Sequence, residues 1–329
     1  MRVYEIETGS RGLDGLRMAE RARPEPGPGQ VLVRVRAASL NYRDIAIVTG
    51  NYFAGPVSRD TVPLSDGAGE VVALGAGVES FAVGDRVVAT FFQPPTGAPL
   101  GSPLDGMLAE YGVFDQQGLV RVPQNLSLEE AATLPCAGVT AWNALIEGKR
   151  VKPGDTVLTL GTGGVSMFGL QIAKAAGACV IATSSSDQKL ERARELGADH
   201  SINYKSTPDW AQAVLDLTGG RGVDHIVEVG GAGTLPMSYR AIGPGGEISL
   251  IGVLSQPHGD SQPYPIMIKR AALRGIFVGD RAALEDLNRA IVVNDIHPEI
   301  DTVFELDDAP QAYRHMVAAK HVGKIVIRI

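Results

Sequence analysis

Residues Leu158 to Ser166 read Leu-Thr-Leu-Gly-Thr-Gly-Gly-Val-Ser, and this stretch decides the fold of the 329-residue chain. The apolar run from Thr156 to Leu160 leads into the glycine turn, and helical spacing from Gly164 to Ala176 follows it. A strand, a glycine turn and a helix in this order are the context that a dinucleotide-binding fingerprint requires. The alternative is a glycine-rich turn that binds nothing, which the flanking strand and helix disfavour.

The residue types in the turn suit a pyrophosphate. Gly161 allows a tight turn, Gly163 lets the backbone approach the phosphates, and a helix that begins at Gly164 offers N–H groups and a partial positive charge. Ser166 stands where the pattern prefers a third glycine, and we expect it only to loosen the packing of helix against strand. The turn therefore predicts a phosphate site.

After the glycine turn, the order of an apolar run followed by a helical segment repeats several times along the chain. Apolar runs at Cys179–Thr183, Val223–Val229 and Glu247–Ile251 are typical of parallel strands covered on both faces. Leu273 to Val278 adds a further strand. Strands that alternate with helices predict a doubly wound parallel sheet. The expected helices lie at residues 187–196, 208–217 and 234–241, and two more at 281–293 and 308–319 precede a final strand at 324–328.

The first part of the chain reads differently, as short apolar runs framed by Gly and Pro. Gln30–Ala37 alternates in the manner of a strand, and Glu70–Leu74 and Asp85–Thr90 are further strand-like runs. Asn41 is predicted to cap one short helix. The Ser-x-x-Glu pattern of Ser127 to Glu130 has the form of a capping box and marks a change of architecture. We therefore predict a β-rich domain that ends near residue 126.

Composition excludes several classes of protein. The chain has 44% apolar residues, 40 Gly and only 2 Cys, so it supports sizeable cores but no disulfide framework. Few cysteines suit a reducing compartment, and we expect a cytoplasmic protein. A net charge of −7 argues against the broad basic surface that nucleic-acid binding requires. No apolar run approaches the roughly 18 residues of a membrane span, and the first residues do not read as a signal peptide.

The end of the second parallel strand indicates which nicotinamide cofactor binds. Proteins that bind NAD normally have an acidic residue about 20 residues after the turn, which binds the ribose 2′-hydroxyl. Here the strand ends in Ser184, Ser185 and Ser186, with no carboxylate. Lys189 follows in the first helical turn, where a cation opposes the helix dipole by a few tenths of a kcal/mol unless an anion is bound. A solvated lysine offset by Asp187 is the alternative; we predict NADPH rather than NADH.

Three stretches together carry a resemblance to a known family. They are Ala-Ser-Leu-Asn-Tyr-Arg-Asp at 38–44, Leu-Pro-Cys-Ala-Gly-Val-Thr-Ala-Trp at 134–142, and the glycine turn with Glu-Leu-Gly-Ala-Asp at 195–199. Over nearly its whole length the chain resembles the zinc-free, quinone oxidoreductase-like branch of the medium-chain dehydrogenase/reductase superfamily. The resemblance implies an α/β protein with a Rossmann doubly wound sheet and a β-rich GroES-like catalytic domain. The expected domains are 1–126 (catalytic, first part), 127–278 (NADP-binding) and 279–329 (return to the catalytic domain).

The same resemblance bears on metal binding. Zinc-dependent relatives hold a catalytic zinc with a cysteine, a histidine and a further cysteine or acid, where this sequence has Asn41, Ser65 and Cys136. Such a set is poor, because sulfur and imidazole ligands supply most of the affinity for zinc. The insertion that carries four structural-zinc cysteines is also absent. We predict no metal, and Cys136 as a small packing residue.

The resemblance also implies which residues bind the cofactor. It places Thr140 beside the nicotinamide and Tyr204 near the 2′-phosphate, and it implies a homodimer through the Leu273–Val278 edge strand, which would otherwise be exposed and apolar. For the apolar members of the set, plain sheet core is a compatible alternative. The set is Gly161, Thr162, Gly163, Gly164 and Val165 for the pyrophosphate, Ser184, Ser185 and Lys189 for the 2′-phosphate, and backbone at Val229, Ile251, Ile276 and Val278 for the ribose and carboxamide.

The expected substrate follows from the missing metal. Without a Lewis acid, a hydride acceptor needs its own electrophilicity, as in a quinone or an alkene conjugated to a carbonyl (enone). Reduction leaves a negative charge for a hydroxyl, amide or water to stabilise. Asn41 and Tyr52 are the catalytic candidates, although a surface-loop tyrosine without a role is an equal alternative. Phe91 and Phe92 offer an apolar wall or simply core packing, and no histidine is assigned a role.

The predicted function is thus an NADPH-dependent quinone or enone reductase. The alternatives on the same fold are an alcohol dehydrogenase and an enoyl-thioester reductase. A third alternative, from another class, is a non-catalytic NADPH-binding sensor.

Overall fold

The computed structural model describes residues 1–254 and 262–329. These divide into two compact units, one of Met1–Val139 with Gly279–Ile329 and one of Thr140–Val278. The first division falls after the boundary expected at 126, because the intervening segment bonds to the β-rich unit. Arg328 Nε donates to Glu129 at 3.1 Å, and the Cys136 N–H donates to Asp66 at 3.3 Å. The second division lies between Val278 and Gly279.

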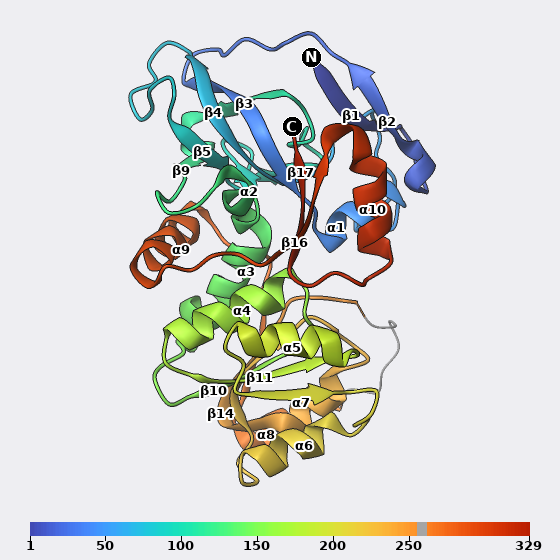
Figure 1. The fold of residues 1–329 in the computed structure, drawn as a ribbon, viewed down its shortest axis with the longest axis vertical. Helices are drawn as coiled ribbons and strands as arrows, with labels where there is room; N and C mark the ends of the chain where they lie inside the picture. The colour runs from blue at the N-terminus through green and yellow to red at the C-terminus, as the bar shows by residue number, and fades with distance from the viewer. Residues whose placement is uncertain (255–261) are drawn as a thin grey trace. The chain divides into compact units, whose positions relative to one another are not determined.

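The unit of residues 140–278 is built on a six-stranded parallel sheet (Figure 1). Its order, β12-β11-β10-β13-β14-β15, is that of a doubly wound dinucleotide-binding sheet, with the switch point between β10 and β13. A ligand is expected at the carboxyl ends of these two strands. The elements are β10 (Thr156–Thr159), α4 (Gly164–Ala175), β11 (Cys179–Ser184), α5 (Asp187–Glu195), β12 (His200–Asn203), α6 (Trp210–Leu217), β13 (Val223–Glu228), α7 (Leu235–Ala241), β14 (Ile242–Leu250), α8 (Tyr264–Lys269) and β15 (Ala272–Gly275), preceded by α3 (Val139–Trp142) and a π-helical turn (Asn143–Glu147).

Two elements of this unit were not predicted. Strand β12 is a four-residue edge strand whose one buried apolar side chain is Ile202, so it has almost no hydrophobic pattern. Helix α8 has only six residues. The last strand is also shorter than the expected Leu273–Val278, ending at Gly275, although the Ile276 N–H still donates to the Leu250 carbonyl at 2.9 Å.

The other unit is β-rich, as expected. Its seven-stranded sheet has the order β16-β17-β3-β4-β5-β9, and β8 pairs with β3 (Figure 1). The elements are β1 (Arg2–Ile6), β2 (Leu16–Glu20), β3 (Gln30–Ser39), α1 (Tyr42–Val48), β4 (Asp66–Leu74), β5 (Arg86–Ala89), β6 (Phe92–Gln93), β7 (Ala98–Pro99), β8 (Tyr111–Asp115), β9 (Leu119–Arg121), α2 (Leu128–Ala131), a π-helical turn (Leu134–Gly138), α9 (Arg281–Asn294), β16 (Ile300–Glu305), α10 (Ala309–Val317) and β17 (Lys324–Arg328), with short 3-10 turns at Leu13–Gly15, Gln116–Gly118 and Leu306–Asp308.

Two pairings in this unit bring distant parts of the chain together. Strand β17, at the C-terminal end, runs antiparallel to β3, with Val326 opposite Ser39 and Ile327 opposite Ala38. Strand β4 pairs with the other edge of β3, with Asp66 opposite Ser39. The first residue of β17, the first of β4 and the residues after β3 therefore meet at one end of the sheet.

Local signals in this unit form as predicted. The Asp44 carboxylate accepts a hydrogen bond from the Asn41 N–H at 2.7 Å, so Asn41 begins α1. At α2 the Ser127 hydroxyl accepts from Glu130 N at 3.1 Å and the Glu130 carboxylate accepts from Ser127 N at 2.7 Å, which completes the capping box.

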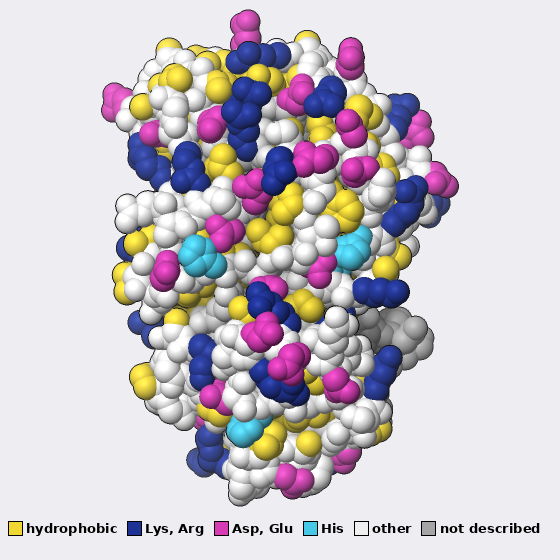
Figure 2. All heavy atoms as spheres, viewed as in Figure 1, with side chains coloured by type: hydrophobic (Ala, Val, Ile, Leu, Met, Phe, Trp, Pro, Cys, Tyr) yellow, Lys and Arg dark blue, Asp and Glu magenta, His cyan; other side chains and the backbone are white. Residues whose placement is uncertain are grey.

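The surface carries charges of both signs. On the face shown in Figure 2, Lys and Arg side chains are interspersed with Asp and Glu. Among the described residues no helix is long and apolar enough to cross a membrane.

Candidate functional site

The glycine turn has the conformation and the space that a phosphate group needs. Gly161 lies in the left-handed region, with φ +74°, and its N–H donates to the Thr183 hydroxyl at 3.2 Å. Gly163 is the N-cap residue of α4 and supplies no side-chain cap. A Cβ atom added to Gly161 or Gly163 would meet no atom within 4 Å, so the helix N-terminus faces open space. The residues present therefore fit a pyrophosphate.

The serine in place of the third glycine has its own partner. The Ser166 hydroxyl is buried and donates to the carbonyl of Leu160, at the end of β10, at 2.7 Å. The hydrogen bond ties the first turn of α4 to the strand and offsets the looser packing that the sequence predicts here.

A buried carboxylate that the sequence analysis missed shapes the neighbouring strand end. Glu228, the last residue of β13, is fully buried. It accepts hydrogen bonds from Gly230 N at 2.8 Å, Gly231 N at 3.0 Å and the Thr234 hydroxyl at 2.6 Å, and from the Ser238 hydroxyl. These bonds fix the loop after β13 at the switch point. An acidic residue that ends an apolar strand just before Gly-Gly is the signal that would have found it.

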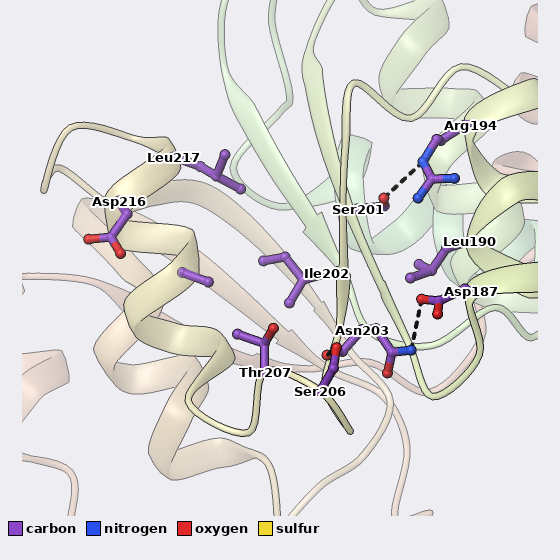
Figure 3. A pocket seen from close by; sticks show the side chains of 11 residues that line it. Asp187, Leu190, Arg194, Ser201, Ile202, Asn203, Ser206, Thr207, Asp216 and Leu217 are labelled. Atoms are coloured by element: carbon purple, nitrogen blue, oxygen red, sulfur yellow. Dashed lines mark hydrogen bonds between the residues drawn. The ribbon is translucent and has the colours of Figure 1, made fainter.

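The structure gathers the residues assigned to the 2′-phosphate at the end of β11. Tyr204 follows β12, and its N–H donates to the Ser184 carbonyl at 3.0 Å. Ser184 is buried, whereas Ser185 and Lys189 are half-buried, so Ser185 offers the more accessible hydroxyl. The nearby Asp187 carboxylate accepts from the Asn203 amide at 2.8 Å (Figure 3).

An open hollow lies beside this strand end. It is lined from α5, β12 and α6, and Figure 3 shows Arg194 bonded to Ser201 and Asn203 bonded to Asp187 along its wall. Its side chains are mixed in charge and several are paired with one another. We assign it no ligand.

The residues assigned to the nicotinamide end are buried or half-buried. Thr140, Ile276 and Val278 are buried, and Val229 and Ile251 are half-buried. Several backbone groups there are already bonded: Ile251 N–H donates to Glu228 O at 2.9 Å, and Val278 O accepts from the Asn143 amide at 2.5 Å. Val278 has φ +58°, a conformation that is strained for a β-branched residue and that clusters at functional sites.

In the β-rich unit, the catalytic candidate Asn41 belongs to a buried polar network. Its Nδ2 donates to Asp66 Oδ2 at 2.9 Å, and its Oδ1 accepts from Lys324 Nζ at 2.6 Å. Lys324 also donates to the Leu40 carbonyl at 2.6 Å and lies 3.8 Å from Asp66 Oδ2. Asp66 further accepts from the Ser65 hydroxyl at 2.9 Å and the Cys136 N–H at 3.3 Å.

The network is almost closed to solvent, and its charges balance. Lys324 is 3% exposed and Asp66 0%. Burial raises the pKa of the Asp66 carboxyl, while the Lys324 ammonium and the three donated hydrogen bonds oppose that rise. Neither Asp66 nor Lys324 was singled out from sequence. An acid that opens β4 and a lysine that precedes the Ile-Val-Ile run of β17 were the available signals.

These side chains do not suit zinc. The Asn41 amide oxygen is taken by an ammonium, which would repel a cation, and burial raises the pKa of the Cys136 thiol, which keeps it from the thiolate form that zinc requires. Within residues 1–254 and 262–329 no group of three or more His, Cys, Asp or Glu is placed to hold a metal.

The second catalytic candidate, Tyr52, contacts a different set of side chains. The Arg43 guanidinium lies 5.2 Å from the centre of the Tyr52 ring and 4.8 Å from that of Phe91, and it donates to the Leu100 carbonyl at 2.9 Å. Tyr52 is half-buried and Phe91 is buried, so Phe91 packs in the core while Phe92 is half-buried. Arg43, which the sequence analysis did not single out, fixes the Tyr52 ring.

Comparison with known proteins agrees with this architecture. The alcohol dehydrogenase GroES-like domain family matches residues 27–124, and the zinc-binding dehydrogenase family matches residues 164–292. A zinc-type alcohol dehydrogenase-like protein of Schizosaccharomyces pombe is 46% identical, over 99% of this chain and 99% of its own length. A 2-haloacrylate reductase of a Burkholderia species is 30% identical, over 92% and 91%. A solved NAD-dependent alcohol dehydrogenase has 34% identity and a TM-score of 0.94, with 100% of both chains covered. The chain therefore belongs to the medium-chain dehydrogenase/reductase superfamily of oxidoreductases, as the resemblance indicated.

The glycine turn yields a first prediction. Gly163→Ala adds a methyl group where no protein atom lies, at a φ of −79° that alanine adopts easily. The melting temperature should therefore fall only slightly, because alanine is a poorer N-cap residue than glycine. The methyl should instead obstruct a pyrophosphate and weaken NADPH binding about tenfold or more, equivalent to about 1.4 kcal/mol. Fluorescence titration with NADPH measures this. Gly12→Ala, also in open space, is the control, and equal affinities in all three proteins would contradict the assignment.

Proposed function

We propose that this chain is an NADPH-dependent reductase that transfers a hydride to a quinone or an activated alkene without a catalytic metal. The observation that carries the proposal is the buried network of Asn41, Asp66 and Lys324. It fills with an amide, a carboxylate and an ammonium the place where the resemblance expects zinc ligands. Such a site offers hydrogen-bond donors but no Lewis acid, which favours acceptors that are electrophilic by themselves.

The proposed division of labour assigns a separate task to each unit. When bound, NADPH supplies the hydride, and the turn at Gly161–Gly164 holds its pyrophosphate. Asn41 donates a hydrogen bond to the acceptor oxygen as negative charge develops there. The Tyr52 phenol, with its ring held by Arg43, donates a further hydrogen bond or a proton.

Support for NADPH comes from the end of β11. No carboxylate belongs to the Ser184–Ser186 segment, and the nearest acid in the chain, Asp187, is engaged by Asn203. Ser185 and Lys189, both half-buried, place a hydroxyl and a cation near this strand end, where a 2′-phosphate would bind. The solved relative described as NAD-dependent makes cofactor preference the point to measure.

Support for an activated alkene comes from one relative. The Burkholderia protein is named for 2-haloacrylate, an alkene conjugated to a carboxyl group. The alcohol dehydrogenase names among the relatives favour the competing function, oxidation of alcohols. In that reaction the alcohol is the hydride donor and the oxidised nicotinamide is the acceptor, so the site would need a base or a metal ion to remove the hydroxyl proton.

A panel of acceptors tests the proposal. Chelator-treated protein should oxidise NADPH, followed by its absorbance, with quinones and simple enones, and should show no alcohol-dependent NADP⁺ reduction. Added zinc should leave these rates unchanged. Alcohol oxidation that appears only with zinc would show a dehydrogenase, activity confined to 2-enoyl thioesters would show a thioester reductase, and NADPH binding without any turnover would show a non-catalytic protein.

Cofactor preference depends on Lys189. Lys189→Ala should weaken NADPH binding about tenfold, since a charge-assisted bond to the 2′-phosphate is lost, and leave NADH binding almost unchanged. Titration of both cofactors measures the ratio. Lys152→Ala, an exposed lysine of the same unit, is the control. An equal loss for the two cofactors would refute the assignment.

We also propose a homodimer through β15. Among the described residues β15 ends the sheet order, and Leu273 of this strand is 42% exposed. Three apolar residues of the preceding α8, Tyr264, Met267 and Ile268, are each more than 60% exposed. Light scattering should give twice the chain mass, and Leu273→Glu should give a monomer. Val293→Glu, at a position on α9 that is 82% exposed, should leave the mass unchanged. A monomeric unaltered chain would sink the proposal.

The compartment remains a proposal as well. Both cysteines are free thiols in the structure, which suits a reducing compartment. We propose the cytoplasm, and cell fractionation that finds the chain elsewhere would contradict it.

A further inference from the structure

The buried lysine of the β-rich unit has a consequence for catalysis. Lys324 places an ammonium in a site that is 3% exposed, where it donates to Leu40 O and Asn41 Oδ1, both at 2.6 Å. Burying an ammonium costs several kcal/mol unless a counter-charge lies close, and Asp66 at 3.8 Å provides one. A neutral hydrogen-bond donor would satisfy the same carbonyl groups with a smaller desolvation free energy. Hydrogen bonding alone therefore does not explain why a charged side chain occupies this position.

The two charges fix the orientation of the Asn41 amide. An ammonium only donates hydrogen bonds and a carboxylate only accepts them. Oδ1 must therefore face Lys324 and Nδ2 must face Asp66, as found. The flipped amide would set oxygen against carboxylate and N–H against ammonium. The second N–H of Nδ2 has no bonding partner among the described residues, so Asn41 offers an incoming molecule a donor and never an acceptor.

We propose that Lys324 is the positioning residue that makes Asn41 an oxyanion donor, an inference that rests on the proposed function and deepens it. A cation bonded to an amide oxygen draws electron density from the nitrogen and strengthens its N–H as a donor. The positive charge of Lys324 thereby acts on the substrate through the amide. Asp66 holds Nδ2 in place and is the counter-charge of the ammonium. A second buried pair, Arg43 and Asp44, lies beside this one, and Asp44 accepts from the Asn41 N–H at 2.7 Å.

The chemical step balances with these groups. The hydride from NADPH forms a C–H bond at the β-carbon of an enone, the alkene electron pair moves into the carbonyl, and the oxygen becomes an enolate that accepts the second N–H of Asn41. A proton from water then forms the bond at the α-carbon. The acceptor gains two electrons and NADPH is oxidised to NADP⁺. With a quinone, addition of the hydride to a ring carbon likewise gives an enolate, and loss of the added carbon's proton with protonation of both oxygens by water gives the quinol.

The test uses 4-nitrophenol as a stable mimic of the enolate oxygen, bound to the NADP⁺-loaded protein. Its absorbance reports whether it is ionised, so a pH titration gives the pKa of the bound phenol. Lys324→Met alone would leave Asp66 as an unpaired buried charge and risks unfolding, so the main variant is Lys324→Met with Asp66→Asn. Asn41→Ala and the triple variant complete a double-mutant cycle. Lys320→Met, an exposed lysine near the same strand, is the matched control.

The expected result is a bound phenol that ionises at lower pH than the free one. Asn41→Ala and the paired variant should each remove most of this shift and about tenfold of the affinity for the phenolate. NADPH affinity should stay close to that of the unaltered protein, and both variants should remain folded at a lower melting temperature, because buried hydrogen bonds are lost. The triple variant should be no weaker than Asn41→Ala, because Lys324 acts through that amide. Additive losses, an unaffected paired variant or no phenolate binding by the unaltered protein would each overturn the inference.

Turnover measured in the same proteins separates this inference from the proposed function. If phenolate binding depends on Lys324 but no quinone or enone is reduced, the proposed function fails and the inference stands. The opposite outcome is also distinguishable. If acceptors are reduced, but the paired variant leaves phenolate binding intact and slows the reduction of strongly and weakly electrophilic acceptors by the same factor, the inference fails and the proposed function stands. An oxyanion donor should instead matter most for the least electrophilic acceptor.

Discussion

The β-rich unit depends on one buried ion pair. Lys324 and Asp66 stand 3.8 Å apart with almost no access to solvent, and their hydrogen bonds reach the end of β3, the start of α1 and the segment around Cys136. Breaking a buried pair by removing one partner typically costs about 3–5 kcal/mol. Sheet register supports the pair, because β17 and β4 flank β3 and bring both residues to the same end of it. The packing of this unit and the chemistry that we propose therefore depend on the same side chains.

The unit of residues 140–278 differs in which groups form its candidate site. Its site is made mostly of backbone: a left-handed Gly161, an uncapped helix N-terminus and a loop after β13 held by Glu228. Side chains there serve to hold the backbone in shape, as Ser166 does through its bond to Leu160. In the β-rich unit the proposed functional groups are side chains. The proposal thus assigns main-chain N–H groups to an anion in one unit and an oriented amide to the substrate in the other.

This contrast explains which features could be predicted from the sequence and which could not. The glycine turn, the strands around it and the caps at Asn41 and Ser127 depend on residues close together in the chain, and each formed as expected. Strand β12 was missed because a four-residue edge strand with one buried apolar side chain has no periodic signal. Asn41 was found through its motif, but its partner Lys324 lies 283 positions away, and only the pairing of β17 with β3 brings the two together. Local spacing holds no information about such a contact.

The interrupted layout of the β-rich unit has a consequence for synthesis of the chain. Residues 140–278 form a compact unit that is complete once its last strand has emerged from the ribosome, whereas the unit begun by residues 1–139 needs residues 279–329. Until Lys324 arrives, Asp66 has no counter-charge and β3 has an open edge beside Ser39. At about 5–20 residues per second, the second half of the chain takes several seconds or more to appear. The sheet of the β-rich unit is therefore incomplete until β17 has been synthesised, long after the strand that it pairs with.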